Sequence, residues 1–92
     1  MITAIVHVSA EVSQIPEVAQ AIAAIDGVSE VYSVTGPIDL IVLVRVRTHD
    51  DIAAVVADRI NKVPGVRDTE THIAFRAYSR HDLEAAFSLG LD

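Results

Sequence analysis

The chain has 92 residues, of which 51% are hydrophobic, and its 7 basic and 13 acidic residues give a formal net charge of −6. A chain of this length forms one small domain that buries about 60–65% of its unfolded surface, which excludes a two-domain enzyme. The negative charge disfavours electrostatic binding to nucleic acid or to an anionic membrane. The absence of cysteine excludes disulfides, thiolate metal sites and cysteine nucleophiles.

No apolar run approaches the roughly 20 residues that a membrane-spanning helix needs. The apolar start over residues 1–10 has no basic segment before it, so it does not have the pattern of a secretion signal. We therefore expect a cytoplasmic protein with no membrane partner, and the lack of cysteine also suits that compartment.

The hydrophobic pattern occurs twice along the chain, with Gly27 and Gly65 at equivalent positions 38 residues apart. Each half begins with an alternating apolar run, which is typical of a strand with one buried face. The residues that alternate are Ala4, Val6 and Val8 in the first half and Val42, Val44 and Val46 in the second. The chain is therefore predicted to contain two copies of one structural unit.

A helix is predicted over about residues 14–25, because apolar side chains recur there at helical spacing. Ser13 is a candidate N-cap, and Pro16 is tolerated because it falls within the first turn. Gly27 allows the left-handed backbone that commonly ends a helix, and a strand is predicted to follow over residues 28–35.

A glycine-proline loop over residues 35–39 connects this strand to the next one. The second helix is predicted to begin after Thr48, which forms a capping box with Asp51 three residues later. It is predicted to end near Gly65, before a last extended run over residues 66–78.

The order strand, helix, strand, strand, helix, strand predicts a ferredoxin-like α+β sandwich, with four antiparallel strands and both helices on one face. We expect this domain to span residues 1–78. Residues 79–92 are predicted to add a short C-terminal helix, because Leu83, Ala86 and Phe87 are spaced like one apolar helix face.

Residues 40–44 are all apolar, although helices cover only one face of such a sheet. Apolar side chains are therefore expected on the face turned away from the helices, where an apolar patch usually marks an interface. The predicted interface residues are Ile5, Ile41, Leu43, Ile73 and Phe75. We expect a homodimer that packs sheet against sheet, and the alternative is that the C-terminal helix folds back over this face.

The chain has no nucleophile elbow, P-loop, dinucleotide-binding fingerprint or HExxH zinc motif, so no catalytic residues and no cofactor are assigned. His7 and His72 fall on the first and last strands, which are neighbours in this fold, and Glu70 lies near them. Two imidazoles and a carboxylate suit a divalent metal. Polar residues on a sheet surface are the commoner interpretation, and no metal is assigned.

The loop over residues 35–39 offers a carboxylate, Asp39, beside a glycine turn at Gly36. One interpretation is that Asp39 caps the turn by accepting hydrogen bonds from nearby backbone N–H groups. The other is that it binds the ammonium group of a zwitterion whose carboxylate meets free backbone N–H groups. The loop alone leaves both interpretations open.

Two segments resemble a known family. They are Val-Tyr-Ser-Val-Thr-Gly-Pro-Ile-Asp-Leu-Ile-Val over residues 31–42 and Val-Pro-Gly-Val-Arg-Asp-Thr-Glu-Thr over residues 63–71. Together they resemble the effector-binding domain of Lrp/AsnC regulators, also called the RAM domain. The resemblance implies a βαββαβ fold, dimers formed by facing sheets, octameric or similar rings of dimers, and amino-acid effectors bound between dimers.

The resemblance also implies a set of ligand-binding residues. These are Gly36, Pro37, Ile38 and Asp39 in the loop and Thr69 and Thr71 on the last strand. Many family members have an aromatic residue where this chain has Ile38. The chain begins at its first predicted strand, so we expect a stand-alone member without the helix-turn-helix domain that binds DNA.

The sequence therefore predicts a non-enzymatic, oligomeric domain that binds a small molecule, most simply an amino acid. A further hypothesis is that it modulates full-length Lrp/AsnC regulators by assembling with them. The alternative is a small dimeric α+β-barrel enzyme of the monooxygenase or isomerase type, which needs His7 or His72 in a cavity between sheet and helices. A third possibility is a purely structural oligomerisation module.

Overall fold

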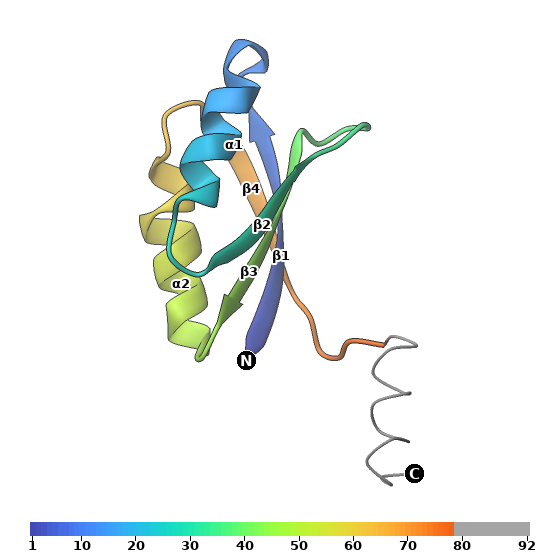
Figure 1. Ribbon diagram of the computed structural model, residues 1–92, viewed down its shortest axis with the longest axis vertical. Helices are drawn as coiled ribbons and strands as arrows, with labels where there is room; N and C mark the ends of the chain where they lie inside the picture. Colours follow the sequence, from blue (N-terminus) through green and yellow to red (C-terminus); the bar gives the residue numbers. More distant parts are fainter. Residues whose placement is uncertain (79–92) are drawn as a thin grey trace, which may run out of the picture.

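A computed structural model of the protein describes residues 1–78, which form a four-stranded sheet covered on one face by two helices (Figure 1). The strands are β1 (Ile2–Ala10), β2 (Val28–Ser33), β3 (Leu40–Val46) and β4 (Val66–Ile73). The helices are α1 (Ile15–Ala23) and α2 (His49–Asp58), and short 3-10 turns occupy η1 (Val12–Gln14) and η2 (Ile60–Lys62). All strand pairs are antiparallel, in the order β2-β3-β1-β4. The predicted ferredoxin-like α+β fold is confirmed.

The core lies between the sheet and the helices, and every buried side chain among residues 1–78 is apolar. Alternate residues of the central strands β1 and β3 face this core, as the alternating pattern predicted. The fully buried members of these strands are Ala4, Val6, Val8, Leu40, Val42 and Val44. Val18 and Ile22 of α1 and Ile52 of α2 close the core from the helix side.

The start of α1 differs from the prediction. Ser13 is not the N-cap, because residues 12–14 form a 3-10 turn in which the N–H of Gln14 donates to the carbonyl of Glu11 at 2.9 Å. Gln14 occupies the cap position without a side-chain hydrogen bond, and Pro16 falls in the first turn as expected. The chain therefore enters α1 through a backbone turn.

Gly27 and Gly65 occupy equivalent turns before β2 and β4, with φ of +96° and +98°. Both helices end a few residues earlier than predicted, so these glycines belong to the turns that follow. Gly65 is also needed for space, since a Cβ there would lie 2.5 Å from Gln14 Oε1 and 2.7 Å from Val18 Cγ2. The close approach of α1 to this turn therefore depends on glycine.

The register of β4 shows that one predicted interface residue was assigned to the wrong face of the sheet. Ile73 pairs with Ala4, whose side chain faces the helices, so Ile73 lies on the helix side of the sheet and does not share a face with Ile5. Val66 pairs with Ala10 on the same side, although Val66 and Ile73 are an odd number of residues apart. A register shift between Ser9 and Ala10 accounts for this, because an extra residue in one strand reverses the alternation.

Strands β2 and β4 are shorter than the predicted runs over residues 28–35 and 66–78. The predicted helix over residues 79–92 lies outside the described residues. Within residues 1–78, neither helix has the length and apolar character needed to cross a membrane.

The capping box of α2 provides a stability prediction. The Thr48 hydroxyl accepts from the N–H of Asp51 at 3.1 Å, and the Asp51 carboxylate accepts from the N–H of Thr48 at 3.3 Å. Thr48→Ala is expected to lower the free energy of unfolding by about 1 kcal/mol in urea denaturation, because a helix N–H loses its partner. Thr35→Ala, in an exposed loop, is the control and is expected to change it by less than about 0.5 kcal/mol.

Candidate functional site

The loop between β2 and β3 lies at the end of a hairpin that extends beyond the rest of the sheet (Figure 1). Asp39 ties this loop to the end of β1. Its Oδ2 accepts from the N–H of Ala10 at 2.9 Å, and its own N–H donates to the carbonyl of Val8 at 3.1 Å. Its carbonyl also accepts from the N–H of Val34 at 3.1 Å, which closes the turn. The Asp39 carboxylate therefore anchors the loop to β1. This differs from the interpretation in which it caps its own turn, because that turn is closed by the backbone hydrogen bond from Val34.

The other loop residues differ in their exposure. Gly36 has a φ of +111°, and a Cβ at this position would have no atom within 4 Å, so conformation alone favours glycine here. Pro37 is exposed beside it. Ile38 is partly buried and turns towards the sheet, where it lines a small hollow.

This hollow has a volume of about 110 Å³ and is open to solvent. Its lining comes from the loop, β1 and β4, and consists of His7, Ser9, Ile38, Asp68, Thr69 and Glu70. Two of the predicted ligand-binding residues, Ile38 and Thr69, are therefore brought together here. The polar character of β1 and β4 at this point was visible in the sequence, but His7, Ser9, Asp68 and Glu70 were not predicted as part of the loop site.

Thr69 and Thr71 fall on the opposite face of β4 from Glu70, which lines the hollow. They pair with Val8 and Val6, so both belong to the helix-side row of β4. The Thr69 hydroxyl donates to Asn61 Oδ1 at 2.7 Å, near the end of α2. Thr71 is exposed and does not line the hollow, so the structure brings only one of the two threonines near Ile38.

The face of the sheet that α1 and α2 leave uncovered is called the open face below. Pairing of the strands places on it Tyr32, Ile41, Leu43, Ile5, His7, Glu70 and His72. Its centre is apolar and partly exposed, because Ile5 pairs with Leu43 and lies beside Ile41 on the central strands. Three of the five predicted interface residues, Ile5, Ile41 and Leu43, therefore share this face.

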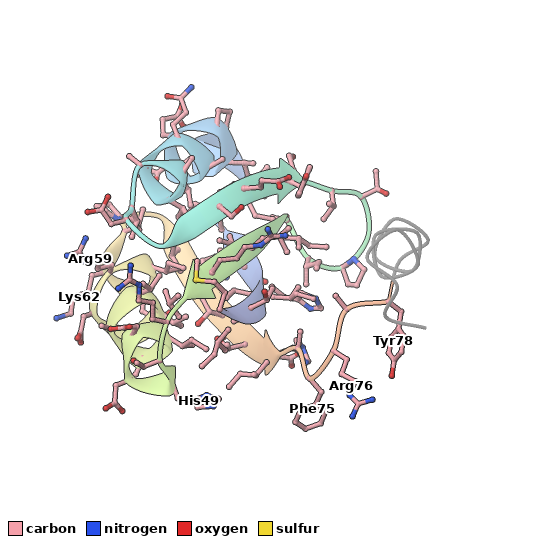
Figure 2. The ribbon with its side chains drawn as sticks, turned by 60° about the horizontal axis from the view of Figure 1, so that its bottom comes forward. His49, Arg59, Lys62, Phe75, Arg76 and Tyr78 are labelled. Carbon is pink, nitrogen blue, oxygen red and sulfur yellow. The ribbon has the colours of Figure 1, made fainter. Side chains whose placement is uncertain are left out.

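Phe75 lies beyond the end of β4 and is 99% exposed. Figure 2 shows Phe75, Arg76 and Tyr78 extending from the segment that follows β4. Phe75 and Arg76 border a second open hollow of about 360 Å³, together with Ile5 and Arg45 of the open face. Phe75 thus lies alongside the open face, at the end away from the loop.

A family model for the Lrp/AsnC ligand binding domain matches residues 3–83 of the chain. PH1916, an uncharacterised HTH-type transcriptional regulator of Pyrococcus horikoshii, is 41% identical over 59 residues, which are 64% of this chain and 39% of that protein. The chain therefore spans about two fifths of the length of this relative.

Solved structures show the same likeness. The crystal structure of TTHA0845 from Thermus thermophilus has a TM-score of 0.82 and 45% identity, and the match covers 87% of this chain and 100% of that one. A feast or famine regulatory protein (Rv3291c) of M. tuberculosis complexed with L-methionine has a TM-score of 0.72 and 26% identity, with 87% and 54% covered.

The fold is a βαββαβ sheet with one open face, and the family model that matches it describes a ligand-binding domain. More specifically, the chain belongs to the Lrp/AsnC ligand-binding domain family, which confirms the resemblance found in its sequence.

The hydrogen bond from Ala10 to Asp39 leads to a second stability prediction. Asp39→Ala leaves the N–H of Ala10 without its partner, and Ala10 is only 3% exposed. The free energy of unfolding is expected to fall by about 1–3 kcal/mol in the absence of any ligand, as measured by urea denaturation. Asp58→Ala, on the exposed end of α2, is the matched control. Equal stabilities of the two variants would contradict the anchoring role of Asp39.

Proposed function

We propose that the protein is a non-enzymatic, oligomeric domain that binds an amino acid at an interface between copies, within the loop site formed by residues 36–39. The observation that carries this proposal is the size and openness of the hollow beside Ile38, about 110 Å³. Sites for small molecules typically have volumes of about 300–1,000 Å³ and enclose most of the ligand. One subunit therefore supplies one wall of a site, and a neighbouring copy is needed to complete it.

The carboxylate of Asp39 suits the ammonium group of an amino acid. One of its carboxylate oxygens is used by Ala10, and a carboxylate has acceptor capacity for further hydrogen bonds from an ammonium group. The loop is held rigidly enough for this purpose, because three hydrogen bonds tie Asp39 to β1 and Val34. The L-methionine bound by the M. tuberculosis relative supports an amino acid as the ligand class.

The open face supports a dimer that packs sheet against sheet. Its centre consists of three partly exposed aliphatic side chains on neighbouring strands, Ile5, Ile41 and Leu43. Contiguous apolar surface of this kind is rare on monomers and usually marks an interface. Phe75, which is almost fully exposed beside Ile5, provides a further apolar group for a partner subunit to cover.

The barrel-enzyme alternative is disfavoured by the position of the histidines. Such an enzyme needs polar groups in a cavity between the sheet and the helices, but no polar or charged side chain of residues 1–78 is buried there. His7 and His72 lie on the open face instead. The name of the Pyrococcus relative, a transcriptional regulator, favours a cytoplasmic role in gene regulation.

A thermal-shift panel of the twenty amino acids tests the ligand. An effector at 100 times its Kd stabilises the native state by about 2.7 kcal/mol, which corresponds to a rise in Tm of roughly 10 °C or more for a domain of this size. Asp39→Asn is expected to abolish this rise, because the variant retains an oxygen for the N–H of Ala10 but loses the charge that attracts an ammonium group.

Asp39→Asn is preferable to Asp39→Ala here, since the alanine variant changes stability without any ligand. Asp58→Asn removes the same charge from an exposed position on α2 and is expected to keep the full rise in Tm. A panel in which no amino acid raises the Tm of the wild-type protein would contradict the effector proposal and favour a structural oligomerisation module.

Leu43→Glu tests the sheet-to-sheet dimer. A charge at the centre of the open face is expected to raise the dimer Kd by about 100-fold or more in analytical ultracentrifugation, because it loses its hydration when the sheets meet. Ala53→Glu, on the exposed side of α2, is expected to leave the Kd unchanged. A wild-type protein that sediments as a monomer at micromolar concentration would contradict the proposed dimer.

We further propose that the protein forms oligomers with other members of the family. Domains with the same fold and the same interface can form oligomers with one another. We therefore propose that the protein modulates full-length Lrp/AsnC regulators by forming mixed oligomers with them. Native mass spectrometry of the protein mixed with such a regulator is expected to detect these species. Only separate homo-oligomers after prolonged mixing would contradict this part of the proposal.

A further inference from the structure

Two histidines and a glutamate form a cluster on the open face, where β1 and β4 pair. His7 lies directly opposite Glu70, and His72 lies opposite Ile5, one pair further along the same face. Each of the three side chains offers one ligand atom, and these atoms all lie within 4.8 Å of one another. This is the one group of three metal-ligating side chains found within residues 1–78.

The distances centre on one oxygen of Glu70. Its Oε1 is 2.8 Å from His72 Nε2 and 3.9 Å from His7 Nδ1, and the two imidazole rings have their centroids 4.9 Å apart. Tetrahedral zinc sites have metal–ligand distances of about 2.0–2.2 Å, which place the ligand atoms about 3.3–3.6 Å apart. The observed separations lie on both sides of this range, so side-chain movements of about 1 Å bring the three atoms into position.

We propose that His7, Glu70 and His72 bind a Zn²⁺ ion. Two imidazole nitrogens and one carboxylate oxygen form a donor set that suits zinc, whereas Ca²⁺ and Mg²⁺ prefer oxygen ligands alone. Three protein ligands leave a fourth position for water or another ligand. In the single chain the side chains of His7, His72 and Glu70 are 32%, 53% and 70% exposed, so an ion reaches them before a second copy covers the open face.

The pairing of β1 with β4 holds the backbone of the two histidines in fixed relative positions. Both histidines project from hydrogen-bonded strands of one sheet, so the relative positions of their Cα atoms are set by the β1–β4 register. The binding of zinc therefore requires reorientation of three side chains only. The competing interpretation is a polar sheet surface in which Glu70 accepts a hydrogen bond from His72 and no ion binds.

Zinc titration of the full chain, without a histidine tag, distinguishes the two interpretations. Competition with a chromophoric chelator is expected to show one Zn²⁺ per chain, unaffected by millimolar Ca²⁺ or Mg²⁺. Glu70→Gln and His72→Ala are each expected to weaken binding by about 10-fold or more, since changes to residues that only orient zinc ligands already cost about 10–100-fold. His49→Ala removes an exposed histidine at the start of α2 and is expected to bind like the wild type (Figure 2).

Circular dichroism of each variant checks that the fold is retained. Zinc that binds the wild type, Glu70→Gln and His72→Ala with equal affinity would overturn the proposal, as would a wild-type chain that binds no zinc. His7 and Glu70 also line the hollow beside Ile38, so His72→Ala, which lies outside that hollow, is the variant that separates this test from the effector test. Loss of zinc binding with an intact amino-acid response, or the reverse, would identify which of the two proposals fails.

Discussion

The packing of both helices against a single face of the sheet is the constraint on which the rest of this structure depends. Val6, Val42 and Ile22 are sealed between the two layers, and this layer of residues 1–78 contains no buried polar group. On the other face of the sheet, the open face, apolar side chains of the central strands remain partly exposed.

Asp39 connects this packing to the candidate effector site. It directly precedes Leu40, which is fully buried, and its carboxylate bonds to the last residue of β1. The loop is thereby held so that Ile38 lines the hollow beside β4. One carboxylate thus contributes to folding and is also the group proposed to meet a ligand, so the stability of the loop and its binding role are coupled. The structure shows a backbone hydrogen bond to the Asp39 carboxylate, and its binding of an ammonium group stays a proposal.

Several of the features that were predicted correctly depend on near neighbours in the chain. The capping box of Thr48 and Asp51 needs a spacing of three residues, and the alternation in β1 and β3 needs only a period of two. Ile73 was assigned to the wrong face because β4 has few apolar residues to define its phase. The shift of register opposite Ser9 and Ala10 then reversed the expected direction.

The sequence by itself determined the order of the elements, the one-sided core and the presence of a glycine-proline loop after β2, because hydrophobic periodicity and turn residues act locally. Tertiary structure alone decided which side chains meet across strands. It brought Thr69 beside Ile38, left Thr71 outside the hollow, and gathered Glu70 with His7 and His72. The physical reason is that pairing register depends on packing along the whole strand, and a shift of one residue exchanges every side chain between the two faces.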